Sequence, residues 1–216
     1  MNTVSLIGCD FSSSPSKRKP IVLALGQARQ GRVQLQALQT FDTLSAFVDW
    51  LAQPADWVGG FDLPFGLPRE LVETLGWPTD WAACMDHYCA LERSDIREQF
   101  AAFCNARPVG GKFAHRAADR PAGSSPSMKW VNPPVAWMMH AGVPLLRAAQ
   151  WTLPGMCEGR PDRVALEAAT GALDAAALQL GVPELAAESL RIASQALERL
   201  VGRLDAERHL ILLQRS

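Results

Sequence analysis

The segment WVGGFDLPFGLP, residues 57–68, consists of a short apolar run followed by a turn that is rich in glycine and proline and contains a single acid. We expect residues 57–61 to form the strand and Asp62 to follow it directly. The glycines permit close backbone approach, and Pro64 and Pro68 restrict the chain that leaves the strand. The pattern therefore predicts a carboxylate held rigidly at a strand end. The alternative is that Asp62 only caps the helix that begins at Pro68.

The elements around this segment follow an order typical of an α/β domain. Three strand-like runs precede it and should pair as an antiparallel meander: Val4–Cys9, Ile21–Gly26 and Arg32–Leu38. A helix is expected over Thr43–Gln53, with Thr43 as its N-cap. Later patterns predict helices over Pro68–Leu75, Trp81–Phe103, Pro134–His140, Pro144–Ala149, Ala172–Leu180 and Glu184–Arg208, and a strand over Arg163–Glu167. This order predicts a single domain, residues 1–216, with an RNase H-like mixed sheet that opens with the meander and has helices packed on it.

Two further acids end predicted strands and are candidates to join Asp62 in one site. Asp10 ends the first strand, where Gly8 leaves the backbone uncrowded, and Glu167 ends the last. Mg²⁺ and Mn²⁺ prefer hard oxygen ligands, and two carboxylates plus a substrate phosphate can suffice to bind them. We predict Asp10, Asp62 and Glu167 as catalytic residues, with Asp10 and Asp62 as ligands of Mg²⁺ or Mn²⁺. The alternative for Asp10 is a turn aspartate that caps nearby backbone amides.

The segment 104–130 lacks apolar periodicity and is rich in Gly, Pro, Ser and basic residues, which is typical of functional or mobile loops. It lies in a basic block, residues 99–157, whose one acid is Asp119. Arg and Lys donate to phosphate oxygens, and histidine can transfer a proton near neutral pH. We predict four substrate-binding residues here: Lys112, His115, Arg116 and Lys129. The alternative is a solvated connector, and the Gly-Gly-Lys sequence lacks the spacing of a nucleotide-binding P-loop.

The composition excludes several classes of protein. With 48% hydrophobic and 20% charged residues, the chain is globular rather than disordered. No apolar run approaches the ~20 residues of a membrane span, so we expect a cytoplasmic protein without a membrane partner. The five cysteines are scattered and predict reduced thiols, and Cys84, His87 and Cys89 lack the second cluster of a zinc site. The net charge of −1 does not by itself indicate a protein that binds nucleic acid. The sequence leaves the oligomeric state open, and a dimer is one of the alternatives.

Four motifs resemble the domain-of-unknown-function family 429, whose members are regarded as predicted nucleases with an RNase H-like fold. The motifs are IGCDF (7–11), GFDLPFGLP (60–68), SMKWVNPPV (127–135) and RVALEA (163–168). Together they extend over about three quarters of the chain, from residue 5 to residue 168. The resemblance implies that Asp10 lies on the first strand of the sheet, Asp62 after the fourth and Glu167 on the fifth.

The chain departs from that family after Glu167. Family members continue with Tyr-Pro and a basic segment, whereas Ala169-Thr170 and Ala/Leu-rich helical patterns follow here. Residues 1–168 are thus the family-like part, and residues 169–216 are a divergent helical C-terminal part without a clear fourth acid. We predict a metal-dependent nuclease, with nucleic acid as the candidate partner. The alternatives are a non-catalytic RNase H-like module that binds a phosphorylated ligand, nucleic acid or a protein, and an enzyme acting on small anionic molecules.

Overall fold

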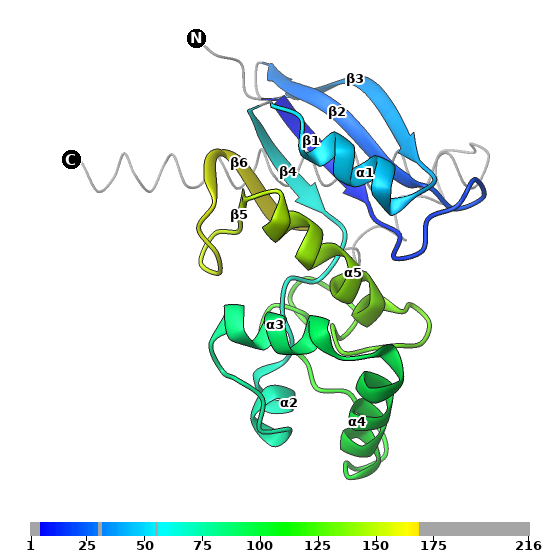
Figure 1. Ribbon diagram of the computed structural model, residues 1–216. Coiled ribbons are helices and arrows are strands. Elements are labelled where there is room, and N and C mark those ends of the chain that lie inside the picture. The colour runs from blue at the N-terminus through cyan, green and yellow to red at the C-terminus, as the bar shows by residue number, and fades with distance from the viewer. Residues whose placement is uncertain (1–4, 30–31, 55, 169–216) are drawn as a thin grey trace.

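The computed structural model describes residues 5–29, 32–54 and 56–168 (Figure 1). Within these residues the strands form one six-stranded mixed sheet with the order β3-β2-β1-β4-β6-β5. The strands are β1 (Ser5–Asp10), β2 (Ile21–Arg29), β3 (Arg32–Phe41), β4 (Trp57–Phe61), β5 (Trp151–Thr152) and β6 (Arg160–Glu167). The chain is therefore an α/β protein, as the sequence predicts. The helices expected over Ala172–Leu180 and Glu184–Arg208 lie outside the described residues.

The antiparallel meander expected at the start of the chain is confirmed. β1 pairs antiparallel with β2, from Ser5 opposite Gln27 to Asp10 opposite Val22. β2 pairs antiparallel with β3, and the register shifts by a bulge between Leu25 and Gly26. β2 and β3 run further than their apolar patterns predict, β2 to Arg29 beside the hairpin and β3 to Phe41 at the opposite end, because the pairing between the two strands continues at both ends.

The centre of the sheet is parallel, and this places three strand ends at one edge. β4 pairs with β1 on one side and with β6 on the other, so that Phe61 lies opposite both Cys9 and Glu167. Close packing requires glycine at position 59, where a Cβ would lie 2.8 Å from the ring of Phe61. Since parallel strands share their direction, the carboxyl ends of β1, β4 and β6 meet at the same edge. Figure 1 shows the chain leaving β4 at this edge towards α2 (Arg69–Thr74).

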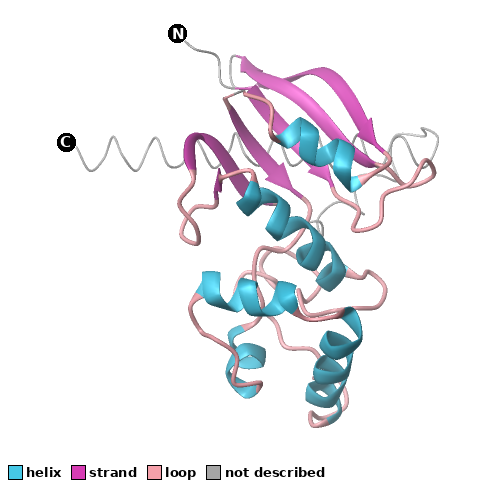
Figure 2. Cartoon of the chain, in the orientation of Figure 1, coloured by secondary structure: helices cyan, strands magenta, loops and turns pink. Residues whose placement is uncertain are grey.

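Two helices pack against one face of the sheet, α1 (Leu44–Leu51) and α5 (Val135–Ala148) (Figure 2). Thr43 caps α1 as predicted, because its hydroxyl accepts a hydrogen bond from the Ala46 amide at 3.2 Å. Aromatic rings join the helices to the strands: Trp57 contacts Trp50 of α1, with ring centres 4.2 Å apart, and Trp151 of β5, at 4.3 Å. These contacts make one continuous core between the helices and the sheet.

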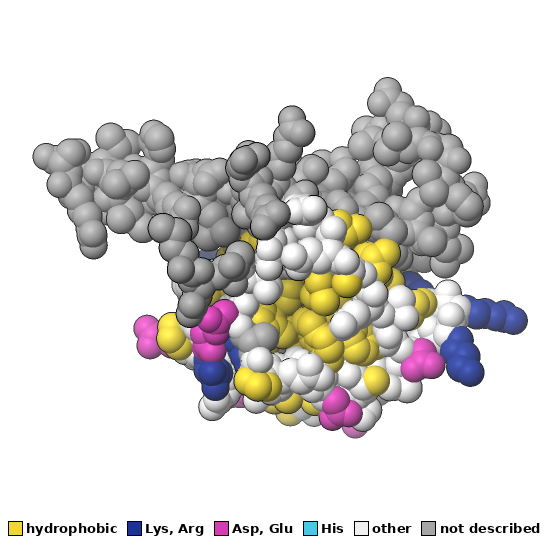
Figure 3. All heavy atoms as spheres, turned by 90° about the horizontal axis from the view of Figure 1, so that it is seen from above, with side chains coloured by type: hydrophobic (Ala, Val, Ile, Leu, Met, Phe, Trp, Pro, Cys, Tyr) yellow, Lys and Arg dark blue, Asp and Glu magenta, His cyan; other side chains and the backbone are white. Residues whose placement is uncertain are grey.

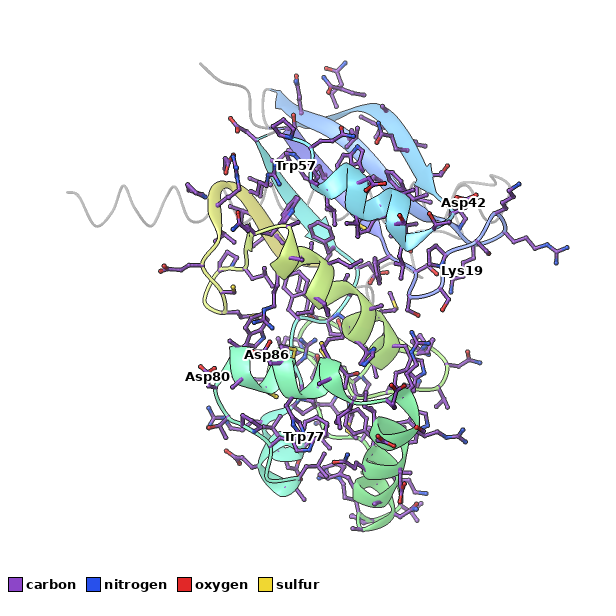
Figure 4. All side chains as sticks on the ribbon, viewed as in Figure 1. Lys19, Asp42, Trp57, Trp77, Asp80 and Asp86 are labelled. Carbon is purple, nitrogen blue, oxygen red and sulfur yellow. The ribbon has the colours of Figure 1, made fainter. Side chains whose placement is uncertain are left out.

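A second group of helices lies beyond the carboxyl edge of the sheet, as Figure 1 shows. It consists of α2, α3 (Trp81–Ala90) and α4 (Arg93–Asn105). Trp77 lies among these helices and contacts Tyr88 and Phe100, whereas Trp57 lies in the upper layer with the sheet (Figure 4). Seen from above, apolar side chains gather in the middle of the described surface and charged side chains lie around its border (Figure 3).

Two helix boundaries differ from the sequence predictions. The helix expected over Trp81–Phe103 is two helices, because Leu91 and Glu92 have extended backbone conformations between α3 and α4. The two helices expected on either side of residue 142 are the single helix α5, which continues through Pro144. Proline removes a backbone hydrogen bond, but Met139, Val143 and Leu146 of α5 are all buried in the core, and this packing offsets the loss.

The irregular segment predicted over residues 104–130 is confirmed from residue 106, where α4 has ended, and it continues to residue 134. The short edge strand β5 was not predicted, because a two-residue strand leaves no periodicity to detect. In the part of the chain that the structure describes, no helix is both long and apolar enough to cross a membrane.

Gly159 offers a test of this packing. A Cβ at Gly159 would lie 2.5 Å from the carbonyl oxygen of Gln150, a backbone atom that cannot rotate away. We expect Gly159→Ala to lower the free energy of unfolding by about 1–3 kcal/mol, measured by urea denaturation. The matched control is Gly111→Ala, whose Cβ would come no closer than 3.8 Å to other atoms. Equal stability of the two variants would contradict the packing described for β5 and β6.

Candidate functional site

The three predicted acids lie at the ends of three neighbouring parallel strands. Asp10 is the last residue of β1, and Asp62 follows β4, where its amide donates to the carbonyl oxygen of Cys9 at 2.9 Å. Glu167 is the last residue of β6, and the next amide, that of Ala168, donates to the carbonyl oxygen of Phe61 at 2.8 Å. The backbone pairing therefore brings Asp10, Asp62 and Glu167 together at the carboxyl edge of the sheet.

The electrostatics of Asp62 reflect this convergence. Burial, together with the charges of Asp10 and Glu167, raises the pKa of Asp62 to about 8. The buried thiol of Cys9 has a raised pKa for the same reasons, burial first and then the charges of Asp10 and Asp62. Asp62 is therefore largely protonated at neutral pH unless a cation compensates its charge.

Both carboxylate oxygens of Glu167 have hydrogen-bond partners. Arg116 binds it in a bidentate pair, with Nη1 donating to Oε2 at 2.7 Å and Nη2 donating to Oε1. The backbone amide of Phe65 also donates to Oε2, at 3.0 Å. Glu167 thus fixes both Arg116 and the turn that follows Asp62.

Arg116 connects this edge to the irregular segment. Its Nε donates to the carboxylate of Asp119 at 2.8 Å, and its backbone amide donates to the same carboxylate at 2.8 Å. Asp119 is completely buried, whereas Glu167 is only partly buried. These hydrogen bonds and charges raise the pKa of Arg116 despite its burial, so the guanidinium stays charged between its two acids.

The other predicted substrate-binding residues are only partly assembled around Arg116. A cavity of about 360 Å³ opens beside it, and His115 lines this cavity together with Arg116. Lys112 is exposed and Lys129 half-buried, and neither lines the cavity. The structure therefore brings two of the four predicted residues together and leaves Lys112 and Lys129 apart from them.

Sequence reasoning missed three residues of this cavity, Arg107, Phe113 and Arg120. The basic block over residues 99–157 contains both arginines, but a charge count cannot tell which of its members face one another. Glu70 on α2 also lines the cavity, although it lies more than thirty residues away from Arg107 in the sequence. A contact over this separation leaves no local pattern in the sequence.

The donor set suits a divalent cation at the aspartate pair rather than at all three acids. No cluster of three or more His, Cys, Asp or Glu side chains placed to hold a metal ion occurs among residues 5–29, 32–54 and 56–168. Asp10 and Asp62 are hard oxygen donors at the ends of adjacent strands, and Arg116 and the Phe65 amide bind Glu167. A cation between these two aspartates would also offset the burial and the like charge that raise the pKa of Asp62.

Comparisons of the chain with protein-family models, with curated proteins and with solved structures find no match. The resemblance to the domain-of-unknown-function family 429 therefore stays a prediction from the motifs quoted above.

The raised pKa of Asp62 predicts a pH-dependent effect on stability. Because its pKa is about 8 in the folded protein and near 3.8 when unfolded, the folded state binds the extra proton between these values. Wild-type stability should therefore fall as the pH rises from about 4 to 8, and Asp62→Asn should remove this loss. Since Asp62 is half-buried, we expect the variant to gain roughly 2–4 kcal/mol over wild type between pH 4 and pH 9.

Urea denaturation at a series of pH values measures this difference. Asp42→Asn is the matched control, because Asp42 is exposed near the start of α1 (Figure 4). We expect the difference in the free energy of unfolding between this variant and wild type to be the same at every pH. Parallel stability profiles of wild type and Asp62→Asn would show that burial and the neighbouring charges do not raise the pKa of Asp62 as described.

The pairing of Arg116 predicts a large loss of stability when its charge is removed. Arg116→Ala leaves the buried carboxylate of Asp119 without its guanidinium, so we expect a loss of roughly 3–5 kcal/mol in the free energy of unfolding. Arg69→Ala is the control, because the exposed pair of Arg69 with Glu73 should contribute less than about 0.5 kcal/mol. Similar losses in the two variants would contradict a structural role for Arg116.

Proposed function

We propose that this protein is a metal-dependent nuclease, which hydrolyses phosphodiester bonds with an RNase H-like domain. The observation that carries the proposal is the placement of Asp10 and Asp62 at the adjacent carboxyl ends of β1 and β4, with their charges acting on each other. The sheet order supports it, since an antiparallel meander followed by parallel strands is the order that the motif resemblance implies. Paired carboxylates at one sheet edge are a common arrangement for cation-assisted phosphoryl chemistry.

Asp10 and Asp62 would hold the ion, Mg²⁺ or Mn²⁺, as oxygen ligands. A bound divalent ion supplies Lewis acidity towards a phosphate oxygen and lowers the pKa of a bound water. Before the ion binds, the proton on Asp62 limits the repulsion between the two carboxylates. Metal binding is therefore coupled to loss of that proton, and we expect tighter binding as the pH rises towards 8.

Glu167 takes a positioning role in this proposal, although the sequence predicts it as catalytic. It holds the Arg116 guanidinium at the edge where the aspartates lie, and its bond from the Phe65 amide fixes the turn that begins at Asp62. Lys112 and Lys129 stay candidates for contacts with more distant phosphates of a nucleic-acid strand.

A non-catalytic module is the second candidate, and the pairing of Glu167 with Arg116 favours it. A third carboxylate occupied by a guanidinium has little capacity left to bind a second ion. The same edge would then bind a phosphorylated ligand, nucleic acid or a protein partner without cleaving it.

Cleavage assays separate the two functions. We expect the full chain to cleave at least one of a single-stranded, a duplex and a DNA–RNA hybrid substrate when Mg²⁺ or Mn²⁺ is present, and not after chelation. Asp62→Asn should lower the rate by about two orders of magnitude or more, because it removes a charged ligand. Asp42→Asn, which changes an exposed acid, should retain the wild-type rate.

The contrary result is equally clear. If no substrate is cleaved faster by the wild type than by Asp62→Asn, the protein is not a nuclease acting through this pair. Salt-dependent binding of nucleic acid that survives Asp10→Asn unchanged would then support the non-catalytic module.

A further inference from the structure

We propose that the cavity beside Arg116 binds the phosphate monoester of a nucleotide, with the base against Phe113. The cavity has a volume of about 360 Å³, within the range of small-ligand sites, and its charged and aromatic lining consists of Glu70, Arg107, Phe113, His115, Arg116 and Arg120. The inference rests on the proposed function for its biological context, because Arg116 lines the cavity and also binds Glu167. Its chemistry stands on the residues of the cavity itself.

Arg107 is oriented before any ligand arrives. Its Nε donates to the carbonyl oxygen of Gly111 at 2.7 Å, its Nη1 pairs with Glu70, and its guanidinium lies 4.9 Å from the ring centre of Phe103. These contacts use Nε and Nη1, and the donors on Nη2 have no hydrogen-bond partner within the described part of the chain. A fixed guanidinium with donors to spare is suited to phosphate oxygens.

Arg120 and His115 add further donors to the lining of the cavity. Both side chains are exposed, and neither forms a hydrogen bond or ion pair with any residue that the structure describes. The charge of Arg116 is already offset by Asp119 and Glu167, so the excess positive charge of the cavity comes from Arg107 and Arg120 against Glu70. Positive charge concentrated in a concave site favours an anion, and a doubly charged monoester more than a singly charged diester.

Phe113 distinguishes a nucleotide from inorganic phosphate. Its half-buried ring is held by Trp130, with ring centres 5.7 Å apart, and forms the aromatic part of the lining. Bases stack on such rings with little dependence on their identity. The shared ligand chemistry is therefore a base with an attached phosphate monoester, and its source is either a free mononucleotide or the phosphorylated end of a strand.

Calorimetric titration of the full chain without divalent metal tests the site. The probes are adenosine 5′-monophosphate, adenosine and inorganic phosphate, at one fixed low salt concentration. We expect the monophosphate to bind at least tenfold more tightly than adenosine, and more tightly than inorganic phosphate. Arg120→Ala should weaken its binding at least fivefold, whereas Arg18→Ala, which removes an exposed arginine from the turn between β1 and β2, should change it less than twofold.

Two results would overturn the proposal. One is equal affinity for adenosine and its monophosphate, and the other is an equal effect of Arg120→Ala and Arg18→Ala, which would indicate only general attraction to positive charge. Oligonucleotides of one sequence with a 5′-phosphate or a 5′-hydroxyl distinguish the sources. A preference for the phosphorylated strand identifies a strand end as the ligand, and equal binding of the two strands beside tight mononucleotide binding identifies the free nucleotide.

The same titration separates this site from the nuclease proposal. Asp62→Asn should bind the monophosphate as wild type does, because Asp62 does not line the cavity. Monophosphate binding without any metal-dependent cleavage would refute the nuclease and leave the cavity proposal standing. Cleavage without monophosphate binding would refute the cavity proposal alone.

Discussion

Burial and like charge of the carboxylates at one edge of the sheet are the constraint around which this part of the structure is organised. Three parallel strands end side by side, and each brings an acid to that edge. The structure accommodates the charges in two different ways: the raised pKa of Asp62 keeps a proton there near neutral pH, and Arg116 neutralises Glu167. A cation that compensates the charge of Asp62 would release its proton and so reverse the first arrangement. The second arrangement is the bidentate pair of Arg116 with Glu167, in which Arg116 also pairs with the buried Asp119.

Arg116 connects the three features on which the functional proposals depend. It pairs with Glu167 at the sheet edge, with buried Asp119 inside the irregular segment, and it forms one wall of the cavity. A segment without helix or strand is held in place by few backbone contacts, so side-chain bonds of this kind determine where it lies. The position of Arg116 therefore places the cavity next to the acids at the sheet edge, and the two functional proposals rest on this arrangement.

Much of the fold could be predicted because local patterns determine it. The apolar runs indicated β1, β2, β4 and β6, Thr43 indicated the start of α1, and the Gly-rich turn indicated an acid at the end of β4. The errors occurred where distant contacts outweigh local preference. Pro144 lies inside a helix because α5 is held by the core, and the two-residue strand β5 exists only through its pairing with β6.

By itself, the sequence determined the α/β class, the meander, and the acids that end three strands, because hydrophobic periodicity and turn residues act over a few positions along the chain. Only the tertiary structure decided that β4 lies between β1 and β6, that Glu167 pairs with Arg116, and that Arg107, Arg120 and Glu70 line one cavity. These relations join residues tens of positions apart. They depend on which strands pair and where an irregular segment packs, and such contacts leave no periodic trace in the order of the amino acids.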